Sequence, residues 1–209
     1  MRRPLAPVLA AALAAALAGC SAAATPAEVA ATSAVPAVTG PGPLTSARLT
    51  VDDLPLGFTS QEGSADAVAL GCAGIDGVYL AAGTADRAAV SFAHTLNAAF
   101  VNETITSRPG GAAEAALARF GAAATDCAWF TGPDGTAYRV AAVALPRYGD
   151  GSAALRVTSG LAEARPVELA AVRLGDTVIA VAAAGTGRGD ADLTRTVVAR
   201  ALAKLTRTR

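Results

Sequence analysis

The chain has 209 residues, of which 53% are hydrophobic and only 4% are aromatic, so its core must be built mainly from Ala, Val and Leu. Its 17 basic and 17 acidic side chains cancel to a formal net charge of zero. A nucleic-acid partner therefore has no electrostatic support, since nucleic-acid binding needs a basic patch.

The first 20 residues have the layout of a bacterial secretory signal. Arg2 and Arg3 give a positive start, and an uncharged apolar stretch follows over residues 5–17. That stretch is shorter than the ~20 residues that a membrane-spanning helix needs. The sequence Leu-Ala-Gly-Cys at 17–20 resembles the lipobox, in which the cysteine receives a diacylglyceryl group and the preceding peptide bond is cleaved.

We therefore expect a lipoprotein signal peptide at 1–19 and lipid, including palmitate-type acyl chains, on Cys20. Two acyl chains hold a protein stably on a membrane, because each buried CH₂ contributes ~0.8 kcal/mol. This predicts a protein anchored to the cell membrane on its extracytoplasmic face. The alternative is an ordinary secretory signal in which Cys20 occurs by chance.

Residues 20–45 are predicted to be a flexible tether. They contain mainly Ala, Ser, Thr, Pro and Gly, with Glu28 as the one charged residue. Such a composition cannot bury enough apolar surface to offset the entropy lost on ordering. We expect the folded domain to occupy 46–209.

Apolar periodicity and turn residues predict the elements of this domain in chain order. They are a helical turn at 51–54, strands at 58–61, 87–93 and 98–107, a helix at 112–124, strands at 127–130, 137–145, 153–159, 167–174 and 177–183, and a helix from 190. Residues 64–83 are expected to be a loop or an irregular helix.

Runs of consecutive strands favour antiparallel pairing. The predicted fold class is α+β, with a curved antiparallel sheet of about six or seven strands. The two longer helices are expected to pack on one face of that sheet.

Three cysteines occur in the chain. If Cys20 carries lipid, Cys72 and Cys127 remain, and an even remainder outside the cytoplasm predicts a disulfide. The alternative is a reactive thiol, which needs a basic neighbour that lowers its pKa.

The sequence contains no recognisable catalytic or metal-binding constellation. His94 is the only histidine, and neither zinc-ligand spacing nor a nucleophile elbow is present. Glu103 has no second carboxylate at a fixed spacing. We therefore expect a protein that is not an enzyme, with no metal and no cofactor.

Scarce large or ionisable side chains are the candidates for a ligand cleft. They are His94, Trp129, Tyr138 and Arg139. For the aromatic residues, packing in the core or on the sheet is the competing interpretation. For His94 the competing interpretation is a polar residue at the end of a strand.

Several features together resemble a known family. They are the lipobox, the Ala/Pro tether, the sequence Leu-Pro-Leu-Gly-Phe at 54–58, a cysteine on each side of the middle helix, and Trp129-Phe130. This pattern is similar to the sensor-domain-like lipoproteins of high-GC Gram-positive bacteria, which are related to the extracellular domain of PknH-type serine/threonine kinases. The resemblance implies an antiparallel sheet flanked by helices and a cleft for a small ligand. The chain lacks the second disulfide of many members and any kinase domain.

We predict a non-enzymatic ligand-binding or sensor-like domain with an unidentified small-molecule or envelope ligand. The alternatives are a cell-envelope hydrolase that uses carboxylates and a lipid or glycan carrier. Two carboxyl groups about 5–9.5 Å apart in a pocket would favour a glycosidase. A large apolar cavity would favour a carrier, and a shallow polar cleft would favour a binding module.

Overall fold

The computed structural model describes residues 43–61, 69–80, 86–161, 164–185 and 190–208. The predicted signal peptide, Cys20 and the tether as far as residue 42 lie outside these ranges. Within these ranges, no helix has the length and apolar character needed to cross a membrane.

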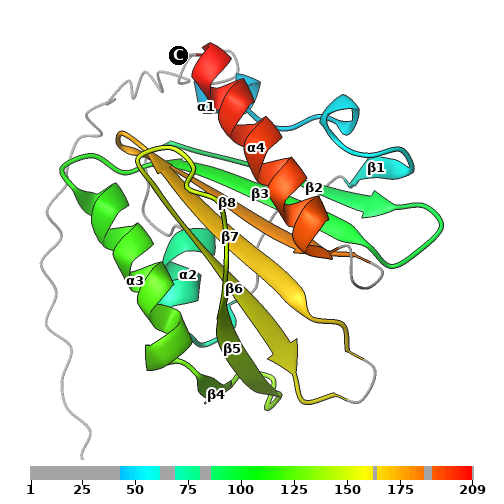
Figure 1. Ribbon diagram of the computed structural model, residues 1–209, viewed down its shortest axis with the longest axis vertical. Coiled ribbons are helices and arrows are strands. Elements are labelled where there is room, and N and C mark those ends of the chain that lie inside the picture. Colours follow the sequence, from blue (N-terminus) through cyan, green and yellow to red (C-terminus); the bar gives the residue numbers. More distant parts are fainter. Residues whose placement is uncertain (1–42, 62–68, 81–85, 162–163, 186–189, 209) are drawn as a thin grey trace, which may run out of the picture. The chain divides into compact units, whose positions relative to one another are not determined.

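The described residues form an α+β domain whose elements follow the predicted order closely (Figure 1). The elements are α1 (Pro43–Ser46), the 3-10 turn η1 (Val51–Asp53), β1 (Phe58–Gln61), α2 (Ala73–Tyr79), β2 (Arg87–His94), β3 (Phe100–Ser107), α3 (Ala112–Asp126), β4 (Trp129–Thr131), β5 (Ala137–Val143), β6 (Gly151–Ser159), β7 (Val167–Leu174), β8 (Thr177–Ala184) and α4 (Asp190–Thr208).

The strands form an open sheet in the order β1-β2-β3-β8-β7-β6-β5-β4, and every neighbouring pair is antiparallel. The first three strands form a meander from one edge. Helix α3 then carries the chain to the opposite edge, from which β4 to β8 return towards the centre. Strand β8 closes the sheet by pairing with β3.

The sheet is covered by helices on both faces, which corrects the prediction that both longer helices lie on one face. Along β8, Ile179 and Val181 belong to the core that includes α4, whereas Ala180 and Ala182 belong to the core that includes α2 and α3. All eight residues of β8 are buried. A strand that is apolar on both sides needs a cover on each side. The α+β class and the antiparallel sheet are confirmed, with eight strands in place of six or seven.

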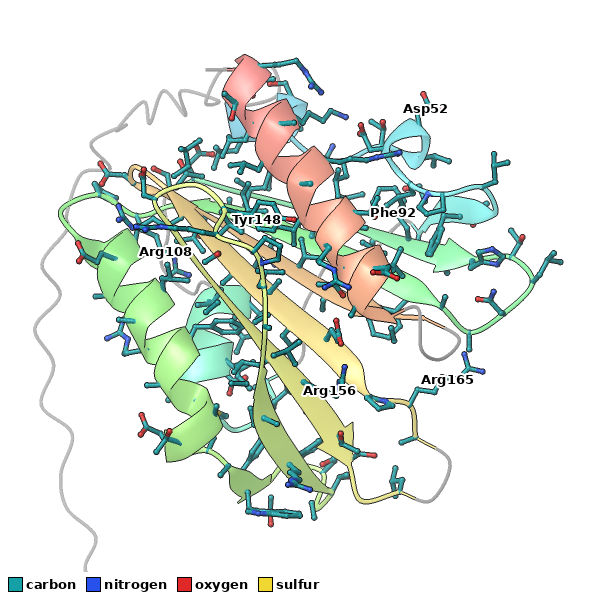
Figure 2. All side chains as sticks on the ribbon, viewed as in Figure 1. Asp52, Phe92, Arg108, Tyr148, Arg156 and Arg165 are labelled. Atoms are coloured by element: carbon teal, nitrogen blue, oxygen red, sulfur yellow. A yellow bond between two sulfur atoms is a disulfide. The ribbon has the colours of Figure 1, made fainter. Side chains whose placement is uncertain are left out.

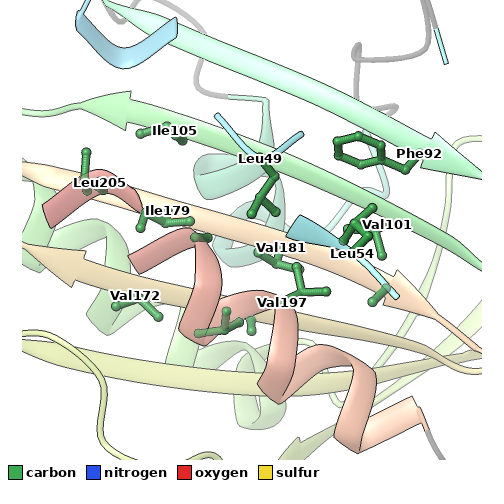
Figure 3. Packing of buried hydrophobic residues seen from close by; sticks show 14 of the residues in the cluster. Leu49, Leu54, Phe92, Val101, Ile105, Val172, Ile179, Val181, Val197 and Leu205 are labelled. Atoms are coloured by element: carbon green, nitrogen blue, oxygen red, sulfur yellow. The ribbon is translucent and has the colours of Figure 1, made fainter. Parts of the chain in front are cut away.

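The core on the α4 side joins the N-terminal segment to the sheet (Figure 3). Val197 and Leu205 of α4 pack there against strand residues such as Val172 and Ile179. Leu44 of α1 and Ala47 just after it are also buried. The folded domain therefore begins before residue 46, and the predicted tether ends earlier than residue 45 because Leu44 packs into this core.

The core on the other face holds α2 against α3. Gly74 of α2 allows a close approach, because a Cβ at this position would lie 2.6 Å from the backbone oxygen of Arg119. A disulfide joins Cys72, just before α2, to Cys127, just after α3, with the Cα atoms 6.0 Å apart. The predicted disulfide is confirmed, and it fixes α2 beside the end of α3.

Candidate functional site

A cavity of about 310 Å³ lies between α2 and the sheet face that α2 covers. We call it the α2 cleft. Most of its lining surface is apolar, with polar side chains from α2, β3, the ends of β5 and β6, and the segment just before β7. The lining residues are Leu70, Ile75, Asp76, Tyr79, Phe100, Asn102, Thr104, Tyr138, Val157, Ser159, Arg165, Val167, Leu169 and Ala182.

The floor of the α2 cleft is hollow because small and large side chains alternate across the strands. Asn102 of β3 pairs with Ala182 of β8, which in turn pairs with Leu169 of β7. In the neighbouring row, Thr104 pairs with Ala180. The alanine methyl groups of β8 leave space between the larger residues on either side.

The α2 wall is fixed by hydrogen bonds that Tyr79 donates and Asp76 accepts. The Tyr79 hydroxyl donates to the backbone oxygen of Val181 at 2.7 Å, which ties the helix to the centre of the sheet. Burial raises the pKa of Tyr79 far above its usual range, so the phenol stays neutral. The Asp76 carboxylate accepts the backbone N–H groups of Leu70 and Gly71 at 2.8 and 2.9 Å. Both oxygens of this carboxylate therefore hold the loop before α2.

Two polar groups on the floor are open to a ligand. Among the described residues, neither the Asn102 side-chain amide nor the Thr104 hydroxyl has a hydrogen-bond partner. Thr104 is only 4% exposed as a residue, but its hydroxyl is accessible from the cleft and is not sealed in the core. A molecule in the α2 cleft can therefore form hydrogen bonds with both groups.

Arg165 lies just before β7 (Figure 2). It lines the α2 cleft and is exposed, so it lies at the mouth of the cleft. Its guanidinium donates to the backbone oxygen of Gly185 at 3.4 Å, a long contact, and most of its donors have no other partner within the described part of the chain. Asp76 and Arg165 are the charged residues in the lining. The described lining therefore contains one carboxylate, and the paired acids of a glycosidase are absent from it.

Of the four residues predicted for a ligand cleft, Tyr138 lines the α2 cleft and the other three lie elsewhere. The Tyr138 ring stacks on Phe130 with 5.2 Å between the ring centroids. Trp129 and Arg139 form the cross-strand pair next to Phe130 and Tyr138. Because side chains alternate along a strand, they point to the opposite face of the sheet. There the Arg139 guanidinium lies 5.3 Å from the Trp129 ring, which is 71% exposed.

His94 ends β2, near the edge of the sheet that is farthest from β4. Its ring meets that of Phe58 edge-on at 5.2 Å, and its Nδ1 accepts the backbone N–H of Leu96 at 3.2 Å. Gly57 packs so closely that a Cβ there would lie 2.3 Å from His94 Nε2. These contacts give His94 a local structural role, and the four predicted residues do not share one cleft.

The described residues contain no group of three or more His, Cys, Asp or Glu side chains that could hold a metal ion. Several polar residues that line the α2 cleft were not among the sequence candidates, namely Asp76, Asn102, Thr104, Ser159 and Arg165. Asn102 and Thr104 lie together on β3. The sequence does contain a pattern that could have identified them: Asn102, Thr104 and Thr106 occupy every second position of one strand. Such alternation predicts that polar side chains share one face of the sheet.

Comparison with known proteins finds similarity among solved structures only at the level of the fold. No protein-family model matches the chain, and no curated protein matches it. Among solved structures, the fold is similar to the crystal structure of the extracellular domain of PknH from Mycobacterium tuberculosis. The TM-score is 0.49 and the sequences are 17% identical over 74% of this chain and 79% of that chain.

Proposed function

We propose that this protein is a lipid-anchored, extracytoplasmic binding protein that holds a small, largely apolar molecule in the α2 cleft. The observation that carries the proposal is the cavity of about 310 Å³ with apolar walls and, on its floor, two polar side chains that have no hydrogen-bond partner among the described residues. Ligand pockets typically measure ~300–1,000 Å³ and combine apolar walls with a few placed polar groups. The volume favours a ligand at the small end of this range.

Binding without catalysis is supported by the chemistry of the lining. Among the described residues of the lining, Asp76 supplies the one carboxylate, and both of its oxygens already accept backbone N–H groups. A hydrolase of the carboxylate type needs a free general acid and a second carboxylate. The small volume also argues against a carrier for lipids with two long acyl chains.

The extracytoplasmic location is supported by the Cys72–Cys127 disulfide, since such bonds persist in oxidising compartments. The lipid anchor is supported by the lipobox-like sequence at 17–20. Changing Cys20→Ser is expected to move the protein from the membrane fraction to the soluble fraction, or to leave it unprocessed, while its fold is kept. Cell fractionation and thermal unfolding check this. Membrane attachment of the variant equal to that of the wild type would contradict the anchor.

Filling the α2 cleft is expected to abolish binding. In Ala182→Phe, the added ring would occupy the space above the floor, because Ala182 lines the cavity. We expect the affinity for the neutral fluorophore N-phenyl-1-naphthylamine to fall by about tenfold or more, equivalent to ~1.4 kcal/mol or more. The titration is done on the exported full chain that carries Cys20→Ser, so that no attached lipid competes.

The matched control is Ala141→Phe, since Ala141 is exposed on β5 and its side chain points to the opposite face from Val140. This variant is expected to bind the fluorophore as the wild type does. Thermal unfolding of both variants reports whether the fold is kept. Equal binding by a folded Ala182→Phe variant would place the ligand elsewhere and refute the proposal.

A further inference from the structure

The two ends of the α2 cleft differ in their chemistry, and this difference points to a class of ligand. Charge is found at the mouth, where Arg165 is exposed, whereas the floor offers the uncharged amide of Asn102 and the hydroxyl of Thr104. The surfaces between these ends come from Val167, Leu169 and other apolar side chains.

We infer that the α2 cleft binds an anionic amphiphile whose acidic group pairs with Arg165 and whose apolar body extends over the sheet towards Asn102. The inference rests on the proposed function and names its ligand class. A carboxylate is the simplest such group, because it matches the fork of guanidinium donors.

The position of Asp76, the second charged residue of the described lining, determines which way the ligand is oriented. The Asp76 carboxylate lies in the α2 wall and would repel an anion placed beside it. It faces the backbone N–H groups of Leu70 and Gly71, so it offers no site for an acidic head. An acidic group in the apolar middle of the cleft would lose its hydration without a counter-charge, which is costly. The anionic group therefore belongs at Arg165, where it also keeps contact with water.

The register of the sheet gives the length of the apolar body. Leu169 lies in the same cross-strand row as Ala182 and Asn102. Arg165 precedes Leu169 by four residues, which is about 13 Å along the strand direction at ~3.3 Å per residue. Strand β8 lies between β3 and β7, so at ~4.8 Å per strand the two ends are also about 10 Å apart across the sheet, and their direct separation is about 16 Å. The long Arg165 side chain and the hydrogen bonds at each end cover part of this distance, and an extended ten-carbon chain covers the rest.

The inner end of such a ligand meets Asn102. An uncharged hydrogen-bonding group at that end would pair with the Asn102 amide, which has no partner among the described residues, whereas a methyl end would not. A hydroxyl at the far end of the chain is therefore expected to increase the affinity.

The experiment compares decanoate, decanol and 10-hydroxydecanoate as competitors of N-phenyl-1-naphthylamine on the full chain with Cys20→Ser. The wild-type cleft is expected to bind decanoate about fivefold more tightly than decanol, the size of a partly exposed ion pair. In Arg165→Gln this preference is expected to disappear through weaker binding of decanoate, with decanol unchanged. The advantage of 10-hydroxydecanoate over decanoate is expected to disappear in Asn102→Leu.

Arg139→Gln is the matched control, because Arg139 is an exposed arginine on the other face of the sheet. It is expected to leave all three affinities unchanged. The inference would be overturned if the wild type bound decanoate and decanol with equal affinity. It would also be overturned if Arg165→Gln lowered the affinities for both compounds by the same factor. If both compounds compete equally and Ala182→Phe blocks them, the proposed function stands and only the anionic ligand class fails. If none of the three competes, both fail.

Discussion

Replacing Glu103 with glutamine is expected to remove most of the pH dependence of the domain's stability between about pH 5 and about pH 8. Glu103 is 1% exposed and lies on β3, on the sheet face that α4 covers. Its Oε2 accepts the backbone N–H of Leu49 at 2.7 Å, whereas its Oε1 has no partner among the described residues. The carboxyl group thus holds the chain before η1 to the sheet.

Burial raises the pKa of Glu103 from 4.5 to about 7. The hydrogen bond from Leu49 and the charges of Lys204 and Arg48 act in the opposite direction, and the charge of Asp53 adds to the rise. Lys204 does not neutralise Glu103 directly, because its ammonium group is 2.6 Å from the Asp53 carboxylate. Desolvation therefore outweighs the favourable interactions of the charged form.

The direction of the effect follows from proton binding. Between the two pKa values the folded state holds a proton on Glu103 that the unfolded chain has released, so stability falls as the pH rises through this range. The stabilisation is fully present below the unfolded pKa and is lost above about pH 7. For wild type, the free energy of unfolding is expected to be about 2–3 kcal/mol larger near pH 5 than near pH 8.

Urea unfolding at several pH values measures this slope in wild type and in Glu103→Gln. The matched control is Glu114→Gln, since Glu114 is exposed on α3. The control is expected to keep the wild-type slope, whereas Glu103→Gln becomes more stable than wild type near pH 8 because it has no buried charge to form. A slope in Glu103→Gln equal to that in wild type would show that Glu103 ionises normally.

Loss of the disulfide is expected to have the largest effect on stability. Cys72 and Cys127 are 55 residues apart in the sequence, and closing a loop of this length restricts the unfolded chain by about 4 kcal/mol in the chain-entropy account. Replacing both cysteines with alanine should lower the free energy of unfolding by about this amount. Because the bond fixes α2, which forms one wall of the α2 cleft, binding of N-phenyl-1-naphthylamine should weaken as well.

A reducing agent supplies the control for the disulfide. It should lower the stability of the wild type to that of the double alanine variant and leave the variant itself unchanged. Thiol counting on the unfolded wild-type protein should find no free thiol at either position. Two free thiols, or a reductant effect of equal size in both proteins, would contradict the account.

Much of the fold was predictable because local signals are strong in this chain. The hairpin between β7 and β8 turns at Gly175 and Asp176, and Gly175 has a positive φ that glycine adopts readily. The turn between β4 and β5 was likewise marked by the glycines at 132 and 135. The pairing of Cys72 with Cys127 was predictable because the chain has three cysteines, and assigning Cys20 to lipid leaves these two.

Features that depend on tertiary packing were harder to predict. Residues 177–184 are apolar on both sides of the strand, which is typical of a strand buried between two layers. The composition alone does not say which helix covers which side, so the placement of α3 and α4 on opposite faces could not be predicted. Helix α2 is only seven residues long and contains Gly74 and Gly77, so its sequence has weak helix propensity. Its packing on α3 and the disulfide stabilise it.

The candidate site could be predicted only in part. Tyr138 was identified because large polar aromatics are scarce in this chain, and the same reasoning selected Trp129, which alternation places on the opposite face. Asn102 and Thr104 are ordinary residues in the sequence. Their importance comes from the alanines beside them on β8 and from α2 above them, and these are contacts between distant segments.

Methyl NMR can decide whether the α2 cleft holds an apolar ligand. Decanoate is titrated into the methyl-labelled full chain with Cys20→Ser. We expect saturable shifts at Ile75, Val157 and Leu169, which line the cleft, and none at Val172 or Val197 in the core of the other face. Shifts confined to the α4 side, or no saturable shift at any methyl group of the cleft, would contradict the claim.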